Sequence, residues 1–171
     1  MFRKSKYMIL AALMLVVLSA CSSNKTIEEE ENSKPEVSST FSIPVTFEEE
    51  GKKGEYILVG EKEKLAFQID SRAEDETIES IESSPIVANK PDKYMWYLWG
   101  ENLSSKPFKV IGINTDTKQE VVIFNDKVLG SELNGADAHT PSTMEFPTAG
   151  IWNLDAYVGE ELFENIVVEV K

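Results

Sequence analysis

The chain has 171 residues, the length of one domain or slightly more at roughly 100–200 residues per domain. It carries 17 Lys and Arg residues against 30 Asp and Glu residues, which gives a net charge of −13. Because phosphate binding is driven by clustered Lys and Arg, this charge argues against a nucleic-acid partner. The single cysteine and single histidine are too few for a disulfide framework or a Cys/His zinc site. We therefore expect no resident metal and no cofactor.

Residues 1–20 have the layout of an export signal. Basic residues stand at positions 3, 4 and 6, and an uncharged apolar run follows at 7–18. A membrane-spanning helix needs about 20 apolar residues, so this run is too short to span a bilayer. Its length and basic flank are typical of the apolar region of a signal peptide. We predict that residues 1–20 are removed on export.

The sequence LSAC at 18–21 resembles the lipobox of bacterial lipoproteins. The resemblance implies that Cys21 is lipidated and becomes the first residue of the mature protein. Two acyl chains hold a protein on a membrane, where one chain binds only marginally. The lipobox therefore implies a place at the cell membrane, on the extracytoplasmic side, with the lipid bilayer as partner. An ordinary secretory signal with a chance cysteine, or an uncleaved anchor, is the alternative.

Residues 21–40 are predicted to be the lipidated cysteine and a flexible acidic tether. Positions 22–40 hold no aromatic residue and only two aliphatic side chains, Ile27 and Val37. So little apolar surface cannot offset the entropy of ordering the chain. The four glutamates at 28–31 keep the tether solvated, or bind cations or a basic partner. The domain predicted at 41–171 has 12 basic and 25 acidic residues, so the acidity belongs to the domain itself.

From residue 41 onward, short apolar segments alternate with period two, which predicts strands. Residues 41–47 contain Pro44 and suit an edge strand. Residues 56–59 and 94–99 are apolar on both faces, which suits central strands. Residues 74–82 are the one stretch with helical spacing. The full set of predicted strands is 41–47, 56–59, 64–70, 94–99, 108–114, 120–124, 151–158 and 162–170, with hairpin turns at 115–118 and 159–161, a charged tip at 48–54, and loops at 85–91 and 132–143.

Seven or eight short strands predict an antiparallel sandwich or barrel. The sequence PTAGIWNL at 147–154 resembles the start of a late strand in immunoglobulin-like domains, where a glycine is followed two residues later by an aromatic at the corner. Trp152 holds the place where tyrosine is commoner, and the inter-sheet cysteine pair is absent. The resemblance implies an immunoglobulin-like β-sandwich over 41–171. The whole chain is similar to small lipoproteins of Gram-positive bacteria that carry such a domain without an assigned activity.

His139 is the place to look for catalysis. Asp137 could orient its ring, and Ser142 or Thr143 could act as the nucleophile. No Gly-x-Ser-x-Gly elbow accompanies these residues. We therefore predict a loop histidine bonded to nearby backbone, and a protein that is not an enzyme. Catalysis by paired carboxylates on an envelope substrate remains open as an alternative, because sequence does not show which acids converge.

The 132–143 loop also offers oxygen ligands from Glu132, Asn134 and Asp137. A Ca²⁺ ion takes six to eight such oxygens, but the spacing does not match the EF-hand pattern. Asn134-Gly135 is a strong turn dipeptide in its own right. A structural turn is the prediction. A ligand-sensing or Ca²⁺-binding accessory lipoprotein using this loop is the alternative.

The densest aromatic cluster lies at 94–99 and includes Trp96 and Trp99. Such a strand either fills the core or exposes a row of rings that stack on sugars or clamp a peptide. Core packing is the prediction. The leading hypothesis is a non-enzymatic surface lipoprotein that binds a protein, peptide or envelope component outside the membrane. The residues proposed for that contact are Trp96, Trp99, Asn134, Asp137 and His139.

Overall fold

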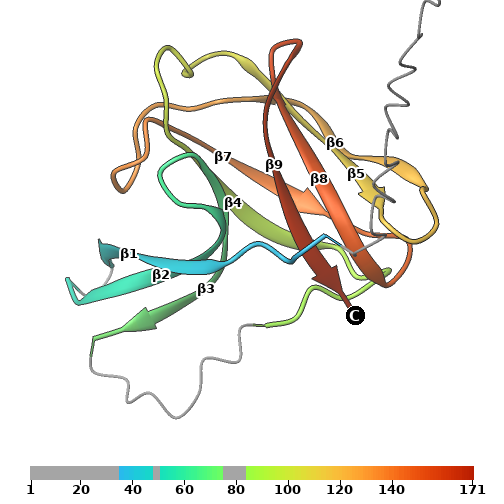
Figure 1. Ribbon diagram of the computed structural model, residues 1–171. Helices are drawn as coiled ribbons and strands as arrows, with labels where there is room; N and C mark the ends of the chain where they lie inside the picture. The colour runs from blue at the N-terminus through green and yellow to red at the C-terminus, as the bar shows by residue number, and fades with distance from the viewer. Residues whose placement is uncertain (1–34, 48–50, 75–83) are drawn as a thin grey trace, which may run out of the picture. The chain divides into compact units, whose positions relative to one another are not determined.

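The computed structural model describes residues 35–47, 51–74 and 84–171, which lie within one compact unit, Ser33–Lys171. Within these ranges the regular secondary structure is entirely β (Figure 1). No described segment is a helix long and apolar enough to cross a bilayer. The strands are β1 (Thr40–Thr46), β2 (Lys53–Glu61), β3 (Leu65–Ala73), β4 (Asp92–Leu98), β5 (Pro107–Asn114), β6 (Glu120–Val128), β7 (Ala138–Met144), β8 (Gly150–Val158) and β9 (Glu161–Val170).

The strands form two antiparallel sheets that enclose one core. The five-stranded sheet has the order β1-β2-β3-β4-β7, and the four-stranded sheet has the order β6-β5-β8-β9. This confirms the predicted all-β antiparallel sandwich, with nine strands in the described ranges instead of seven or eight. The hairpins β5–β6 and β8–β9 turn where the sequence places them. β1 lies at a sheet edge, and β2 and β4 are internal strands, as predicted.

β7 corrects the prediction of a single loop over 132–143, because the second half of that segment is a strand paired with β4. Alternate residues of β7 are buried, but two of them, Thr140 and Ser142, are polar. The sequence pattern therefore showed no apolar alternation. Ser142 tolerates burial because its Oγ accepts a hydrogen bond from Trp96 Nε1 at 3.0 Å.

Some predictions fall outside the described residues. These are the signal peptide, Cys21 and most of the tether, the charged tip at 48–50, and nearly all of the segment with helical spacing at 74–82.

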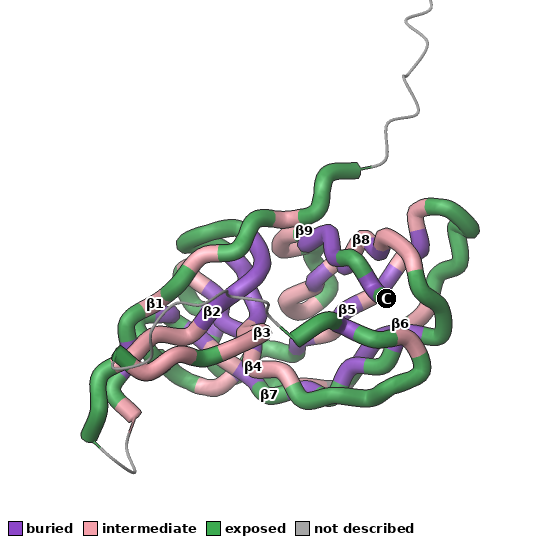
Figure 2. The backbone as a smooth tube through the Cα atoms, turned by 90° about the horizontal axis from the view of Figure 1, so that it is seen from below, coloured by how far each residue is buried: buried purple, intermediate pink, exposed green. Residues whose placement is uncertain are grey.

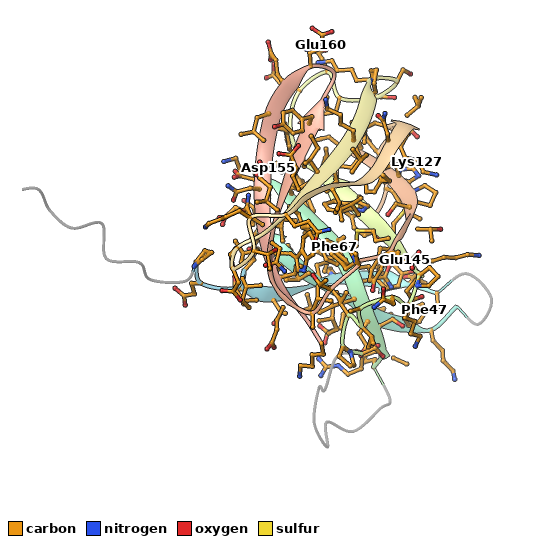
Figure 3. The ribbon with its side chains drawn as sticks, turned by 90° about the vertical axis from the view of Figure 1, so that its right-hand side faces the viewer. Phe47, Phe67, Lys127, Glu145, Asp155 and Glu160 are labelled. Atoms are coloured by element: carbon orange, nitrogen blue, oxygen red, sulfur yellow. The ribbon has the colours of Figure 1, made fainter. Side chains whose placement is uncertain are left out.

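The core between the sheets is built around Trp96 of β4, which is fully buried. Its ring lies 4.9 Å from Phe67, 5.6 Å from Phe108 and 5.7 Å from Phe124, measured between ring centroids. Tilted and edge-on contacts of this kind add to the gain from burying apolar area. Figure 2 shows buried residues along the strands. In Figure 3, Phe67 lies in the interior and Glu160 lies at the tip of the β8–β9 hairpin.

The start of β8 forms the corner that the sequence indicates. Trp152 is fully buried, its ring packs 5.5 Å from Phe146, and its Nε1 donates to the Thr148 carbonyl at 3.0 Å. Gly150 has φ of 128°, a conformation that L side chains rarely adopt. A side chain there would also approach Asn114 Nδ2 to 3.1 Å. The glycine followed two residues later by an aromatic is therefore a packing requirement of this corner.

Candidate functional site

The outer face of the five-stranded sheet, away from the other sheet, carries a second apolar cluster that is separate from the core. Alternation along β4 and the residue directly after it produces the cluster, because Trp96 and Leu98 belong to the core. Met95, Tyr97 and Trp99 belong to the second cluster. We call this group the outer cluster. Its buried members are Leu58, Ala66, Tyr97 and Ala136, and its partly buried members are Phe41, Ile43, Tyr56, Met95, Trp99 and Leu133.

The loop between β6 and β7 folds over one end of the outer cluster. Its tip is a tight turn in which Leu133 and Ala136 exchange backbone hydrogen bonds of 3.0 and 2.9 Å. Asn134 and Gly135 occupy the turn with φ of 51° and 85°, which Asn-Gly adopts readily. This confirms the predicted turn. It places the apolar side chains of Leu133 and Ala136 against the sheet.

Two hydrogen bonds hold the end of β4 against this loop. Trp99 Nε1 donates to the Gly135 carbonyl at 2.8 Å, and the Gly100 N–H donates to Asp137 Oδ2 at 2.7 Å. A hydrogen bond to a carboxylate is stronger than one between neutral groups. The Trp99 ring is thus fixed in position although it remains partly accessible to solvent.

The aromatic rings of the outer cluster come from three strands and the loop contributes a polar contact. Trp99 lies 6.5 Å from Phe41 and 6.4 Å from Tyr97 between ring centroids. Burial raises the pKa of Tyr97, and a side-chain hydrogen bond with Asn134 partly offsets that rise. The phenol therefore stays protonated at neutral pH and serves as a hydrogen-bonding group.

The structure separates the five residues proposed for partner contact. Trp96 lies in the core and has no surface to offer a partner. Trp99, Asn134 and Asp137 come together at the loop end of the outer cluster. His139 is half-buried on β7 opposite Tyr97, and its Nδ1 lies 2.7 Å from the Ser131 carbonyl oxygen. This is the contact with nearby backbone that the sequence predicts, although it is made from a strand.

The geometry bears on two alternatives, catalysis centred on His139 and Ca²⁺ binding by the 132–143 loop. His139 and Ser142 are three residues apart on one strand, so their side chains leave opposite faces of the sheet. Asp137 already accepts the Gly100 N–H. Among the described residues, no group of three His, Cys, Asp or Glu side chains gathers as metal ligands would.

A groove of 880 Å³ shares Asn134 with the loop end of the outer cluster, and we call it the β1–β3 groove. It is bounded by the ends of β1, β2 and β3, and Asn134 of the β6–β7 loop also lines it. Glu55 and Arg72, paired across β2 and β3, form an ion pair at this place. Sequence reasoning missed the contribution of β1 and β2, because the strand register that places them beside β3 is not visible in the pattern of any one segment.

Comparison with known proteins gives a family and a fold. Residues 45–168 match the family model described as "Domain of unknown function (DUF4871)". Among solved structures, the chain resembles one titled "Putative Lipoprotein from Bacillus anthracis", with a TM-score of 0.53 and 21% identity over 81% of this chain and 87% of that one. A search of the curated proteins gave no match. At this identity the structural likeness shows the fold alone. Because the family model covers most of its length, the chain belongs to the DUF4871 family.

Proposed function

We propose that this protein is a lipid-anchored, extracytoplasmic binding protein without catalytic activity. Its lipid is on Cys21, its domain is an immunoglobulin-like sandwich, and its binding face is the outer cluster with the adjoining β1–β3 groove. The observation that carries the proposal is a partly exposed set of aromatic rings on the outer face, held rigid by the bonds of Trp99 and Asp137. Aromatic residues in fixed positions are the usual anchors of a binding surface.

The anchor is supported by the basic residues, the apolar run and the lipobox at the amino terminus. The structurally similar Bacillus anthracis protein is also described as a lipoprotein, which agrees with it. Anionic headgroups repel an acidic domain. A domain with a net charge of −13 is therefore kept near the membrane by its lipid and away from the bilayer surface by its charge.

The immunoglobulin-like assignment is supported by the strand order. Taken as A, B, C, C′, E, F and G, the strands β3 to β9 give the sheets A-B-E and C′-C-F-G, which is the arrangement of immunoglobulin-like domains. β8 then takes the place of strand F. In immunoglobulin-like domains a tyrosine hydroxyl near the start of strand F hydrogen-bonds to the backbone a few residues upstream. Here the indole N–H of Trp152 makes the corresponding hydrogen bond to the Thr148 carbonyl. In this scheme β1 and β2 are an amino-terminal addition.

The anchor is tested by mass spectrometry of the membrane fraction from cells that make the full chain. We expect Cys21 as the amino-terminal residue, carrying a diacylglyceryl group, and loss of the protein from the membrane in Cys21→Ala. An intact chain with an unmodified thiol would contradict the anchor.

The binding face is tested with the anchored protein on envelope preparations from the same cells. Trp99→Ala should weaken retention, because it removes the ring that the loop holds in place. The matched control is Val122→Ala, which truncates an exposed apolar side chain on the four-stranded sheet. Equal retention of both variants would rule out the outer cluster as the binding face.

A further inference from the structure

β3 and β4 pair along only part of their length and then separate. Their antiparallel register contains three pairs, from Leu65↔Leu98 to Phe67↔Trp96. Beyond Phe67, no further pair joins the two strands among the described residues, although β3 continues to Ala73 and β4 extends back to Asp92. The five-stranded sheet therefore contains an internal gap with a strand edge on each side.

A bulge in β3 accounts for the separation. Ile57 of β2 pairs with Asp70, while the next residue, Leu58, pairs with Gln68, which leaves Ile69 as an extra residue. An extra residue bends the bulged strand and increases its local twist. β3 thus stays paired with β2 through the bulge and turns away from β4.

The β3 side of the gap presents a backbone donor at Ser71. Hydrogen-bonded and non-hydrogen-bonded pairs alternate along an antiparallel ladder. Since the Glu74 N–H donates to the Lys53 carbonyl, the N–H of Ser71 faces away from β2 and into the gap. The carboxylate of its neighbour Asp70 accepts that N–H at 2.7 Å.

The β4 side has the same arrangement at Lys93. The Trp99 N–H donates to the Lys64 carbonyl on the β3 side, so the N–H of Lys93, six residues earlier, faces the same side. The carboxylate of Asp92 accepts this N–H at 2.8 Å. Each edge of the gap therefore has a donor whose partner is the adjacent aspartate, not another strand.

The gap contains a cavity of 390 Å³. Ile69 and Tyr94 contribute apolar walls that also pack against the core, and Ser71 and Lys93 are exposed beside them. Burial, with the nearby Asp92 carboxylate, raises the pKa of Tyr94 to about 12. Tyr94 therefore adds no charge to the cavity in neutral solution.

The edges at β1 and β9 are closed by different means. β1 has Pro44 at its centre, which lacks the N–H that an added strand needs. On β9, Ser38 bonds Val167 through both its N–H and its Oγ, and Ile86 pairs with Val170. The gap differs from these edges because the donors at Ser71 and Lys93 are satisfied by aspartate side chains, which can rotate away.

We propose that the gap between β3 and β4 accepts an extended basic peptide as an added strand. The N–H groups of Ser71 and Lys93 would donate to carbonyls of the peptide, as in other sheets that take up an extra strand. The displaced carboxylates of Asp70 and Asp92 would then pair with Lys or Arg side chains of the peptide. Asp70 and Asp92 outnumber Lys93, the one cationic side chain among the described residues that line the cavity, and the domain as a whole is acidic, so a basic occupant is favoured over an acidic one.

The test uses the full-length protein in detergent and a labelled decapeptide of alternating lysine and valine. We expect binding by fluorescence anisotropy, together with slower hydrogen exchange at the amides of Ser71 and Lys93. The variant Asp70→Asn/Asp92→Asn removes both charges from exposed or half-exposed positions, and it should weaken binding up to about tenfold, the scale of two solvent-accessible ion pairs.

The backbone contribution is tested separately from charge. The same decapeptide with alternate peptide nitrogens methylated keeps every lysine but cannot pair as a strand, so it should not bind. Equal binding of the methylated peptide, or slower exchange at Ser42 of β1 instead of Ser71, would overturn the proposal, as would absence of binding. None of these outcomes bears on Trp99 and the outer cluster, so failure here is distinguishable from failure of the proposed function.

Discussion

Trp96 on β4 and Trp99, the residue directly after β4, have opposite surroundings. Trp96 lies between the sheets, fully buried, with three aromatic rings within 6 Å of its own. Trp99 lies on the outer face, partly exposed, and its position depends on a loop carbonyl and on Phe41. The first tryptophan packs in the core, whereas the second is partly accessible to solvent.

The difference shows how one aromatic segment contributes both to the core and to the outer surface of the sheet. Because successive side chains point to opposite faces of a sheet, one strand supplies the core and the outer surface together. The outer rings would be an aggregation hazard if they were fully exposed. The β6–β7 loop and β1 cover them in part, which leaves a limited and ordered apolar surface.

The largest effect should follow from Trp96→Ala, which removes the centre of the core. We expect a loss of about 3–5 kcal/mol in the free energy of unfolding, the range for a large aromatic truncated in a core. Urea unfolding followed by circular dichroism measures it, and Trp99→Ala should lose clearly less. Equal losses would break the distinction between the two faces of β4.

Trp152→Phe should have an intermediate effect. The ring can still pack against Phe146, but the hydrogen bond from Nε1 to the Thr148 carbonyl is lost. Losing this bond costs about 0.5–1.5 kcal/mol, and the cavity left by the smaller phenyl ring at a fully buried position adds to the loss. The same urea experiment applies. A loss as large as that of Trp96→Ala would show that this corner contributes as much as the core centre.

Asp137→Ala should have a smaller and local effect. It removes the acceptor of the Gly100 N–H and so loosens the loop beside Trp99. We expect a loss of about 0.5–1.5 kcal/mol, typical of one hydrogen bond. Hydrogen exchange should accelerate at 99–101 and 131–137 but not in β5 or β8. Unchanged exchange in the loop would mean that Asp137 does not hold Trp99 in place.

The smallest effect concerns pH. Lys64, in the β2–β3 turn, pairs with Glu164 of β9 and so joins the two sheets. Burial alone would raise the pKa of Glu164, but the Lys64 ammonium and the Asn165 N–H outweigh it, and the pKa lies below its ordinary value of 4.5. A lowered folded-state pKa contributes stability above the unfolded-state value, and that stability is lost as pH falls through the folded-state value.

Glu164→Gln should therefore reduce the difference in melting temperature between pH 7 and pH 3, with little change at pH 3. Thermal unfolding of both proteins across this range measures the effect. A pH profile identical to that of the wild type would show that this ion pair does not contribute to joining the sheets.

Much of the fold could be predicted from the chain. Residues 64–70 and 151–158 alternate clearly, because one of their faces lies against the core, and both are strands. β7 could not be predicted in this way, since its buried positions include Thr140 and Ser142. Ser142 is compatible with the core through its bond to Trp96, a residue 46 positions away.

The candidate site also depends on contacts between distant parts of the chain, which local sequence patterns do not show. Asn134-Gly135 predicted a turn from local geometry alone, and the turn is present. The aromatic run at 94–99 indicated a cluster, but its spacing did not show which rings meet Phe41 or Tyr56. Those contacts depend on strand register across the five-stranded sheet, where neighbouring residues come from distant parts of the chain.

The sequence by itself determined the all-β class, the hairpins β5–β6 and β8–β9, the aromatic corner at Trp152 and the net charge of the domain. These features follow from alternation, turn residues and composition, which act over a few neighbouring residues. Only the tertiary structure decided that Trp96 is core and Trp99 is surface, that 138–144 is a strand, and that β3 leaves β4 at a bulge. Each of these depends on packing and register between strands far apart in the chain, where the free energy of burial and hydrogen bonding is set by the partner and not by local propensity.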